Sequence, residues 1–227
     1  MIVADERSLQ FDVGERLGNV SALLNLPDHP RALYLLAHGA GAGMRHAFLE
    51  ATAHGLALRG IGTLRYQFPY MEAQRQRPDP PAVAVATVRG AVRAAQEAAP
   101  GLPLIAGGKS FGGRMTSTAQ SAEALSGVRG LAFLGFPLHA PGKPSASRAD
   151  HLERVTVPML FLQGTRDEFA DLELLRGVCD RLGSHARLHL IESGDHSFRV
   201  PKKAGKTGPE VMDELFDTIA GWTLEVI

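Results

Sequence analysis

The chain has 227 residues, of which 44% are hydrophobic and 21% charged, and this composition predicts one globular domain spanning 1–227. Lys and Arg together number 24, as do Asp and Glu, so the formal net charge is zero. A neutral chain lacks the basic field of proteins that bind nucleic acid or an anionic membrane, so neither is expected as a partner.

Three further features of the sequence point to a cytoplasmic protein. The one cysteine, Cys179, excludes an internal disulfide, argues against a metal site built from cysteines and fits a reducing compartment. The opening residues, MIVADERSLQF, are charged from the fifth position and lack the apolar stretch of a signal peptide. The longest apolar runs are far shorter than the ~20 residues that span a bilayer.

Short apolar runs alternate with longer amphipathic segments along the chain. In its first half we expect antiparallel edge strands at 8–13 and 18–27 around a turn at 14–16, a strand at 32–39, a helix at 46–60, a strand at 61–68, an exposed proline-rich connection at 67–81 and a helix at 82–99. The second half predicts a strand at 102–106, a helix from 111 to about 125, strands at 128–136 and 157–164, a helix at 172–183, a strand at 186–193 and a helix at 209–226. The alternation predicts an α/β fold, a mainly parallel twisted sheet with helices on both faces and ligands at the carboxyl ends of its strands.

The stretch LPLIAGGKSFGGR, residues 102–114, fits two motifs that share one serine. A phosphate-binding P-loop, GxxxxGK[ST], needs a glycine at position 103, where the chain has Pro103, which has no amide proton to offer a phosphate. The other motif, GxSxG, is the sharp strand-to-helix turn that presents a nucleophilic serine, here Ser110. Gly108, Gly112 and Gly113 provide the clearance that this turn requires. We therefore interpret Ser110 as a catalytic nucleophile, with a merely glycine-rich turn as the structural alternative.

A nucleophilic serine needs a histidine to take its proton and an acid to orient that histidine. In hydrolases with this turn the chain order is Ser, then Asp or Glu, then His. Asp167 follows the strand at 157–164, with Glu168 as the weaker alternative, and His196 follows the last expected strand. His139 is the nearest rival to His196, but no later strand then supplies an acid to orient it.

The oxyanion hole is expected from two backbone amides. One is the amide of Phe111, directly after the nucleophile, and the other is the amide of Ala40 in the glycine-rich stretch after the strand at 32–39, with Gly41 as second choice. A dinucleotide-binding interpretation of that stretch needs a third glycine at position 44, where the chain has Met44.

Several residues that follow strands near this site are candidates for the substrate pocket, although each also suits a packing role. They are Gly41, Met44, Arg45, Tyr70, Met71 and Phe136. Arg45 and Lys109 suggest an acidic acyl group in the substrate, with a surface ion pair as the alternative role for Lys109.

Four segments together resemble the α/β-hydrolase superfamily: AHGAGAG (37–43), GGKSFGGR (107–114), QGTRDEF (163–169) and ESGDHSF (192–198). The small size resembles the cap-less, dienelactone-hydrolase-like branch, and the motifs look most similar to the predicted hydrolases related to testis-expressed proteins and an NSL-complex subunit. This resemblance implies a Ser110, Asp167, His196 triad and an eight-stranded sheet with at most one antiparallel strand near its start. Dienelactone hydrolases carry cysteine as the nucleophile, so Ser110 argues against dienelactone as the substrate. The interval at 136–154, where relatives carry a cap, is short and proline-rich, so any lid is expected to be a loop.

The main hypothesis is a serine hydrolase of the carboxylic-ester type that acts on a small ester or acyl substrate without a metal or organic cofactor. The alternative from the resemblance is a hydrolase-fold interaction protein with little or no turnover. Nucleotide binding is a third possibility, which predicts stabilisation by ATP or NAD. The sequence determines neither the substrate nor the oligomeric state.

Overall fold

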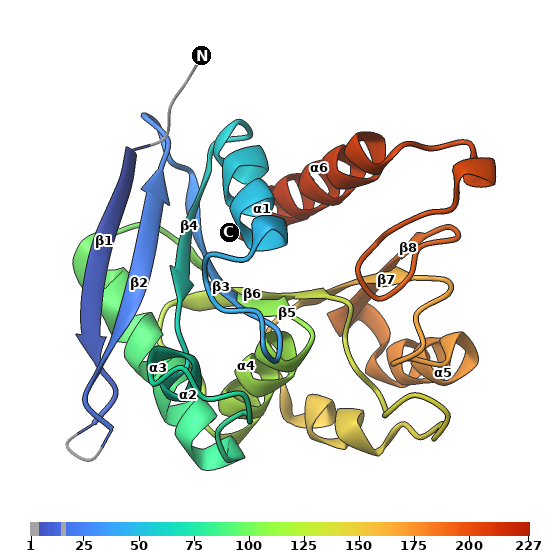
Figure 1. Cartoon of the computed structure of the whole chain (residues 1–227), viewed down its shortest axis with the longest axis horizontal. Coiled ribbons are helices and arrows are strands. Elements are labelled where there is room, and N and C mark those ends of the chain that lie inside the picture. The colour runs from blue at the N-terminus through green and yellow to red at the C-terminus, as the bar shows by residue number, and fades with distance from the viewer. Residues whose placement is uncertain (1–4, 15–16) are drawn as a thin grey trace.

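The computed structural model describes residues 5–14 and 17–227, which form a sheet in the order β1-β2-β4-β3-β5-β6-β7-β8 (Figure 1). The strands are β1 (Asp5–Asp12), β2 (Asn19–Leu26), β3 (Ala32–Ala37), β4 (Ile61–Tyr66), β5 (Leu104–Lys109), β6 (Val128–Leu134), β7 (Met159–Gly164) and β8 (Ala186–Ile191). β2 runs antiparallel to β1 and β4, and the other neighbouring pairs are parallel. The expected α/β class and antiparallel edge are confirmed. The expected turn at 14–16 includes residues 15 and 16, which lie outside the described residues.

Helices cover both faces of this sheet (Figure 1). They are α1 (Ala47–Ala57), α2 (Pro69–Glu72), α3 (Pro81–Ala98), α4 (Phe111–Ala122), α5 (Leu172–Leu182) and α6 (Gly208–Val226), with short 3-10 helices η1 (Ser147–Arg154), η2 (Gly183–His185) and η3 (Lys202–Ala204). α1 and α6 pack on one face, whereas α3, α4 and α5 pack on the other. Because both faces are covered, β3, β4 and β7 are buried along their whole length.

The strand that precedes Ser110 is longer than expected. β5 runs through Lys109 instead of ending at position 106, because Gly107 and Gly108 still pair with β3 and β6. A Cβ at Gly108 would lie 2.2 Å from the carbonyl oxygen of Ala37, so only glycine lets the strand continue here. The pairing carries the chain to the nucleophile turn in a fixed direction.

The expectation of an exposed connection at 67–81 holds for residues 72–77, 80 and 81 but not for the buried positions 68–70 and 79. Pro69 and Tyr70 are buried in the short helix α2. Asp79 is also buried, and its carboxylate accepts hydrogen bonds from the Tyr70 amide at 2.8 Å and from Arg75 at 2.8 Å. One buried carboxylate thus ties the two ends of this proline-rich stretch together.

The interval at 136–154 packs into the fold instead of forming a lid over the sheet edge. Phe136 and Leu138 are buried, and η1 packs against α4. His151 Nε2 lies 2.7 Å from the Ser117 hydroxyl on α4. These contacts hold the interval on the α4 face, and no separate cap domain covers the carboxyl ends of the described strands.

Candidate active site

Ser110 forms the turn between β5 and α4 in a strained backbone conformation, with φ 50° and ψ −115°. Residues other than glycine rarely adopt this backbone region, and each residue held there typically costs about 1–3 kcal/mol of stability. The turn is tightly enclosed, because a Cβ at Gly112 would lie 2.6 Å from the carbonyl oxygen of His38. The packed glycines therefore hold Ser110 at the carboxyl end of the central strand.

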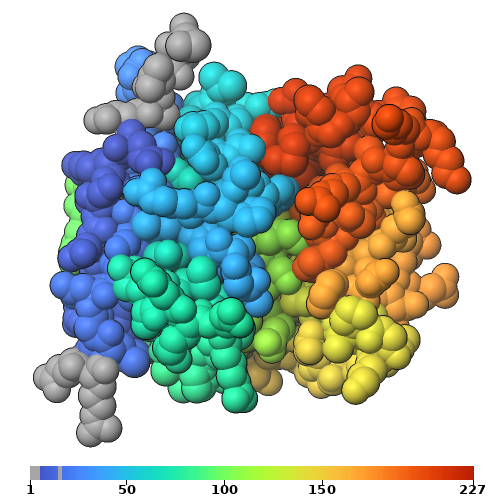
Figure 2. All heavy atoms as spheres, in the orientation of Figure 1, coloured from blue at the N-terminus to red at the C-terminus, as the bar shows by residue number. Residues whose placement is uncertain are grey.

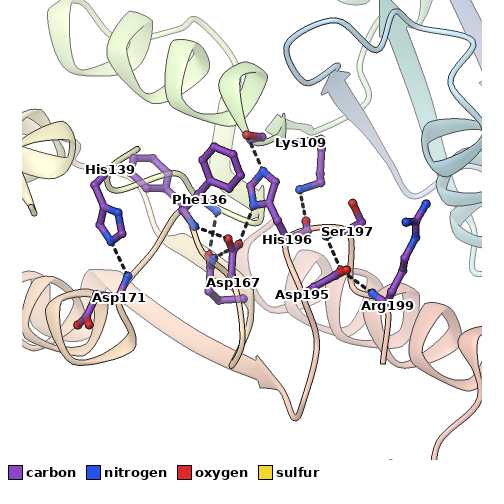
Figure 3. Close-up of polar contacts among 12 residues, drawn as sticks. Lys109, Phe136, His139, Asp167, Asp171, Asp195, His196, Ser197 and Arg199 are labelled. Carbon is purple, nitrogen blue, oxygen red and sulfur yellow. Dashed lines mark hydrogen bonds and ion pairs between the residues drawn. The ribbon is translucent and has the colours of Figure 1, made fainter. Parts of the chain in front are cut away.

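A chain of hydrogen bonds connects Ser110 to two residues from the ends of other strands (Figure 3). His196, in the loop after β8, places Nε2 at 2.9 Å from the Ser110 hydroxyl and Nδ1 at 2.7 Å from a carboxylate oxygen of Asp167, which follows β7. An ionised carboxylate only accepts hydrogen bonds, so Nδ1 carries the proton that binds Asp167. Nε2 is then left as the acceptor for the serine hydroxyl.

The Asp167 carboxylate is buried and receives two further donors. Gln163 Nε2 donates to Oδ2 at 2.5 Å and the Phe169 amide donates to Oδ1 at 2.8 Å. The Gln163 amide is itself oriented, because its Oε1 accepts a hydrogen bond from the Phe136 amide at 2.9 Å. We did not predict a role for Gln163 from the sequence. The available signal was one polar side chain inside the otherwise apolar run MLFLQG.

Hydrogen bonds of His38 and of the Gly41 amide hold the stretch after β3. His38 is fully buried, its Nδ1 donates to the Gly39 carbonyl at 2.8 Å and its Nε2 accepts from the Phe68 amide at 3.1 Å. Burial lowers the pKa of His38 to about 4, so the ring is neutral at pH 7. The Gly41 amide donates to the Tyr70 hydroxyl at 2.9 Å and is therefore occupied.

Two amides near Ser110 have no such partner. Neither the Ala40 amide nor the Phe111 amide donates a hydrogen bond to another described residue. Ala40 lies on the wall of the cavity that contains Ser110, and Phe111 begins α4, where the first amides of a helix are unpaired. Both amides are therefore available to an anionic oxygen.

A cavity of about 480 Å³ opens at Ser110 and His196. Segments far apart in the sequence surround it, and Figure 2 shows the light-blue, green and orange-red parts of the chain meeting on the face drawn. The lining residues are Gly39, Ala40, Ala42, His46, Ala47, Phe48, Leu49, Lys109, Ser110, Phe169, His196, Ser197 and Arg199. Alanine, leucine and phenylalanine side chains form much of the wall, so the cavity suits a largely apolar group.

A comparison with known families shows which family the chain belongs to. The family described as "Alpha/beta hydrolase domain" matches residues 30–224, which is most of the chain. The protein is an α/β-hydrolase.

Solved structures share this hydrolase fold at low sequence identity. A dienelactone hydrolase from Anabaena variabilis is 18% identical, with a TM-score of 0.78 and 99% of each chain covered. A lidless α/β serine hydrolase from Xanthomonas campestris is 19% identical, with a TM-score of 0.75 and coverage of 98% of this chain and 95% of that one. Est1E from Butyrivibrio proteoclasticus with bound ferulic acid is 15% identical, with a TM-score of 0.71 and coverage of 92% and 95%.

The alternative acid, Glu168, and the alternative base, His139, do not join the hydrogen-bonded series at Ser110 in the hydrolase. Glu168 is exposed to solvent, whereas its neighbour Asp167 turns inward to His196. His139 is buried, its Nδ1 donates to the Ala140 carbonyl at 2.9 Å and its Nε2 accepts from the Asp171 amide at 2.8 Å. His139 therefore ties a loop to the start of α5 (Figure 3).

The structure does not bring the expected pocket residues of the hydrolase to the cavity. None of the following lies among the lining residues of the described structure: Gly41, Met44, Arg45, Tyr70, Met71 and Phe136. Tyr70 and Phe136 are buried in the core, and the exposed Arg45 side chain faces Glu6 at 3.6 Å. Each follows a strand as expected, but Met44, Tyr70 and Phe136 are buried in the interior instead of facing the cavity. The cavity is formed instead by the start of α1, with His46 and Phe48, and by Phe169 and Arg199.

The described residues of the hydrolase contain neither a metal-binding cluster nor a membrane-spanning helix. No three His, Cys, Asp or Glu side chains within 5–14 and 17–227 are grouped so that they would hold a metal ion. In the same part of the chain, no helix combines the length and apolarity needed to span a bilayer.

Proposed function

We propose that this α/β-hydrolase is a serine hydrolase that cleaves small carboxylic esters through an acyl-enzyme intermediate. The hydrogen-bonded series Ser110–His196–Asp167 at the cavity carries the proposal. The strained backbone of Ser110 supports it, because strain of this kind is typically retained at functional sites.

Acylation uses the three side chains and the two unpaired amides. The Ser110 oxygen attacks the ester carbonyl carbon while His196 Nε2 takes the hydroxyl proton, and the buried Asp167 carboxylate stabilises the resulting imidazolium. The amides of Ala40 and Phe111 stabilise the negative oxygen of the tetrahedral intermediate. When the intermediate collapses, the C–O bond to the alcohol breaks and His196 returns the proton to the leaving oxygen.

Deacylation repeats the same chemistry with water. His196 takes a proton from a water molecule, which attacks the acyl carbon bound to Ser110. Collapse of the second tetrahedral intermediate releases the carboxylic acid, and His196 returns the proton to the serine oxygen. No cofactor takes part in this proposed sequence.

The apolar part of the cavity wall supports a largely apolar acyl or alcohol group. Phe48 and Phe169 present aromatic surface to it, and its size fits a small substrate. Of the two residues behind the sequence hypothesis of an acidic acyl group, Arg45 lies outside the cavity, whereas Lys109 lines it but is engaged with the protein. Arg45 faces Glu6 outside the cavity, and the Lys109 ammonium donates to the main chain of His196. Aromatic esters, including feruloyl esters, are therefore included in the substrate panel beside short alkyl esters.

The test is labelling with a fluorophosphonate probe together with hydrolysis of 4-nitrophenyl esters of increasing acyl length. We expect the wild type to be labelled and active, and Ser110→Ala to lose both properties. Ser121→Ala is the matched control, because Ser121 lies on α4 and bonds only to the Thr118 carbonyl. Absence of labelling in folded wild-type protein, or equal labelling of Ser110→Ala, would contradict the proposal. An inactive wild type that copurifies with one stoichiometric partner would favour the interaction-protein alternative.

A further inference from the structure

Lys109 directly precedes the nucleophile, and its side chain crosses to the loop that carries His196. The ammonium nitrogen donates a hydrogen bond to the main-chain carbonyl oxygen of His196 at 2.5 Å (Figure 3). It also lies 5.5 Å from the ring centroid of Phe198, close enough for a cation–π contact. Lys109 thus connects the strand that leads to Ser110 with the loop that carries its proposed base, His196.

Gly135 leaves room for the end of this side chain. A Cβ at Gly135 would lie 2.9 Å from Lys109 Nζ, too close for both to stay in place, whereas a Cβ at Gly39 would make only ordinary contact with Lys109 Cγ at 3.5 Å. The same Gly135 position is 3.4 Å from the His196 ring. The ammonium therefore occupies a confined position beside the imidazole, and its direction is set by the surrounding main chain.

The loop at 193–198, which carries His196, has a strained backbone. Ser193 and Phe198 flank His196 with φ of 59° and 61°, values that non-glycine residues seldom adopt. Asp195 shapes the loop internally, because its carboxylate accepts hydrogen bonds from the amides of Ser197 and Arg199 at 2.8 and 2.9 Å. Lys109 supplies a contact of a different kind, since it joins this loop to the strand that carries Ser110.

The ammonium charge of Lys109 faces a main-chain carbonyl of the protein. Burial lowers the pKa of Lys109 to about 8, while the carboxylates of Asp167 and Asp195 act in the opposite direction. At pH 7 the side chain is therefore mostly protonated, and the charged donor faces the His196 carbonyl. A hydrogen bond from a charged group is stronger than one between neutral groups.

We propose that Lys109 is a positioning residue that holds the main chain of His196 so that the imidazole stays aligned between Asp167 and Ser110. This inference rests on the proposed function, because it assigns Lys109 a role in the base's geometry. It replaces the two roles that the sequence suggested for Lys109, which were a contact with an acidic acyl group and a surface ion pair.

The first test compares Lys109→Met with wild type. Methionine keeps most of the apolar stem and removes the donor, so we expect kcat to fall roughly tenfold to hundredfold, the equivalent of one hydrogen bond to a charged group. Lys109 borders the cavity, but methionine keeps its apolar stem there, so KM should change less than kcat. The low-field proton NMR signal of His196 Nδ1–H should weaken or shift. Lys143→Met, at an exposed lysine in the loop before η1, is the control and should match the wild type.

Chemical rescue separates positioning from folding. In Lys109→Cys, alkylation with 2-bromoethylamine forms a C–S bond with loss of bromide and restores an ammonium on a side chain of lysine length. We expect this treatment to recover most of kcat, whereas iodoacetamide, which adds a neutral amide, should not. Cys179 interferes little, because burial raises the pKa of its thiol to about 11 and mass spectrometry identifies the modified position.

The outcomes distinguish this inference from the proposed function. If wild-type protein is not labelled by the fluorophosphonate, the proposed function fails and this inference falls with it. If wild type is labelled and folded Lys109→Met has the same kcat and the same NMR signal, the positioning role is overturned while the hydrolase remains. Should Lys109→Met unfold, Lys109→Gln and the alkylated Lys109→Cys decide the question, and lack of recovery in the folded, alkylated protein counts against the role.

Discussion

Gln163 Nε2 donates to Asp167 Oδ2, the same carboxylate oxygen that accepts from His196 Nδ1. The amide of Gln163 cannot rotate freely, because its oxygen accepts a hydrogen bond from the Phe136 amide. The Gln163 side chain therefore links the Phe136 backbone amide to Asp167, the acid proposed to orient His196.

Removal of the Gln163 side-chain amide should lower both catalytic rate and stability. In Gln163→Leu the buried Phe136 amide loses its acceptor and Asp167 loses a donor, so we expect a loss of about 1–3 kcal/mol in the free energy of unfolding and a roughly tenfold lower kcat. Urea unfolding and ester hydrolysis measure the two effects. Gln120→Leu is the matched control, because Gln120 Oε1 accepts from the Leu125 amide in the same buried manner but away from His196. It should lose stability and keep kcat; an equal loss of kcat in both variants would contradict the role of Gln163.

Tyr70 offers a second prediction, because its hydroxyl anchors the Gly41 amide beside Ala40. Tyr70→Phe removes the anchor and keeps the buried ring. We expect kcat to fall up to about tenfold, as the Ala40 amide becomes less well aligned, with a stability loss of about 1 kcal/mol. Tyr34→Phe removes another buried hydroxyl, which donates to the Ala132 carbonyl at 2.8 Å, and should lower stability alone. Unchanged kcat in Tyr70→Phe would show that this contact does not align the oxyanion site.

The backbone of Ser110 provides a test of stored strain. At φ 50° a glycine avoids the steric cost that both serine and alanine experience. We therefore expect Ser110→Gly to be more stable than Ser110→Ala by about 1 kcal/mol, although both variants lack the nucleophile. Guanidinium unfolding at one pH compares them directly. If Ser110→Ala proves equally stable, the turn stores no measurable strain.

The buried neutral His38 should make stability depend on pH. Its pKa falls from 6.5 to about 4 on folding, so the unfolded chain binds more protons than the folded protein between these values. Stability is retained above about pH 6.5 and lost as the pH falls toward 4, and the contribution of His38 between pH 7 and pH 5 is about 2 kcal/mol.

His38→Asn tests this dependence, because the amide does not titrate. The difference in unfolding free energy between pH 7 and pH 5 should be smaller in this variant by that amount, whatever its absolute stability. The exposed His54 is the comparison, and His54→Asn should keep the wild-type slope. An unchanged slope in His38→Asn would mean that another group carries the pH dependence.

Local patterns account for what could be predicted. The alternation of apolar and amphipathic runs was enough for the α/β class, because strand and helix periodicity depends on residues close in sequence. The same applies to the positions of Ser110, Asp167 and His196 at strand ends. Their catalytic roles stay predictions, although the structure brings the three side chains within hydrogen-bond distance. Within the connection at 67–81, the burial of Tyr70 and Asp79 was missed because it depends on hydrogen bonds that composition does not reveal.

The class of fold and the order of the candidate catalytic residues could be predicted from the amino-acid sequence, since both follow from periodicity and from the chemistry of the nucleophile turn. The directions of the side chains became known only with the packed fold. Arg45 faces Glu6, Lys109 turns to the His196 carbonyl, and Phe48 and Phe169 form the cavity wall. The physical reason is that the direction of a loop side chain depends on contacts between segments distant in sequence, which become fixed only when the sheet and its covering helices pack together.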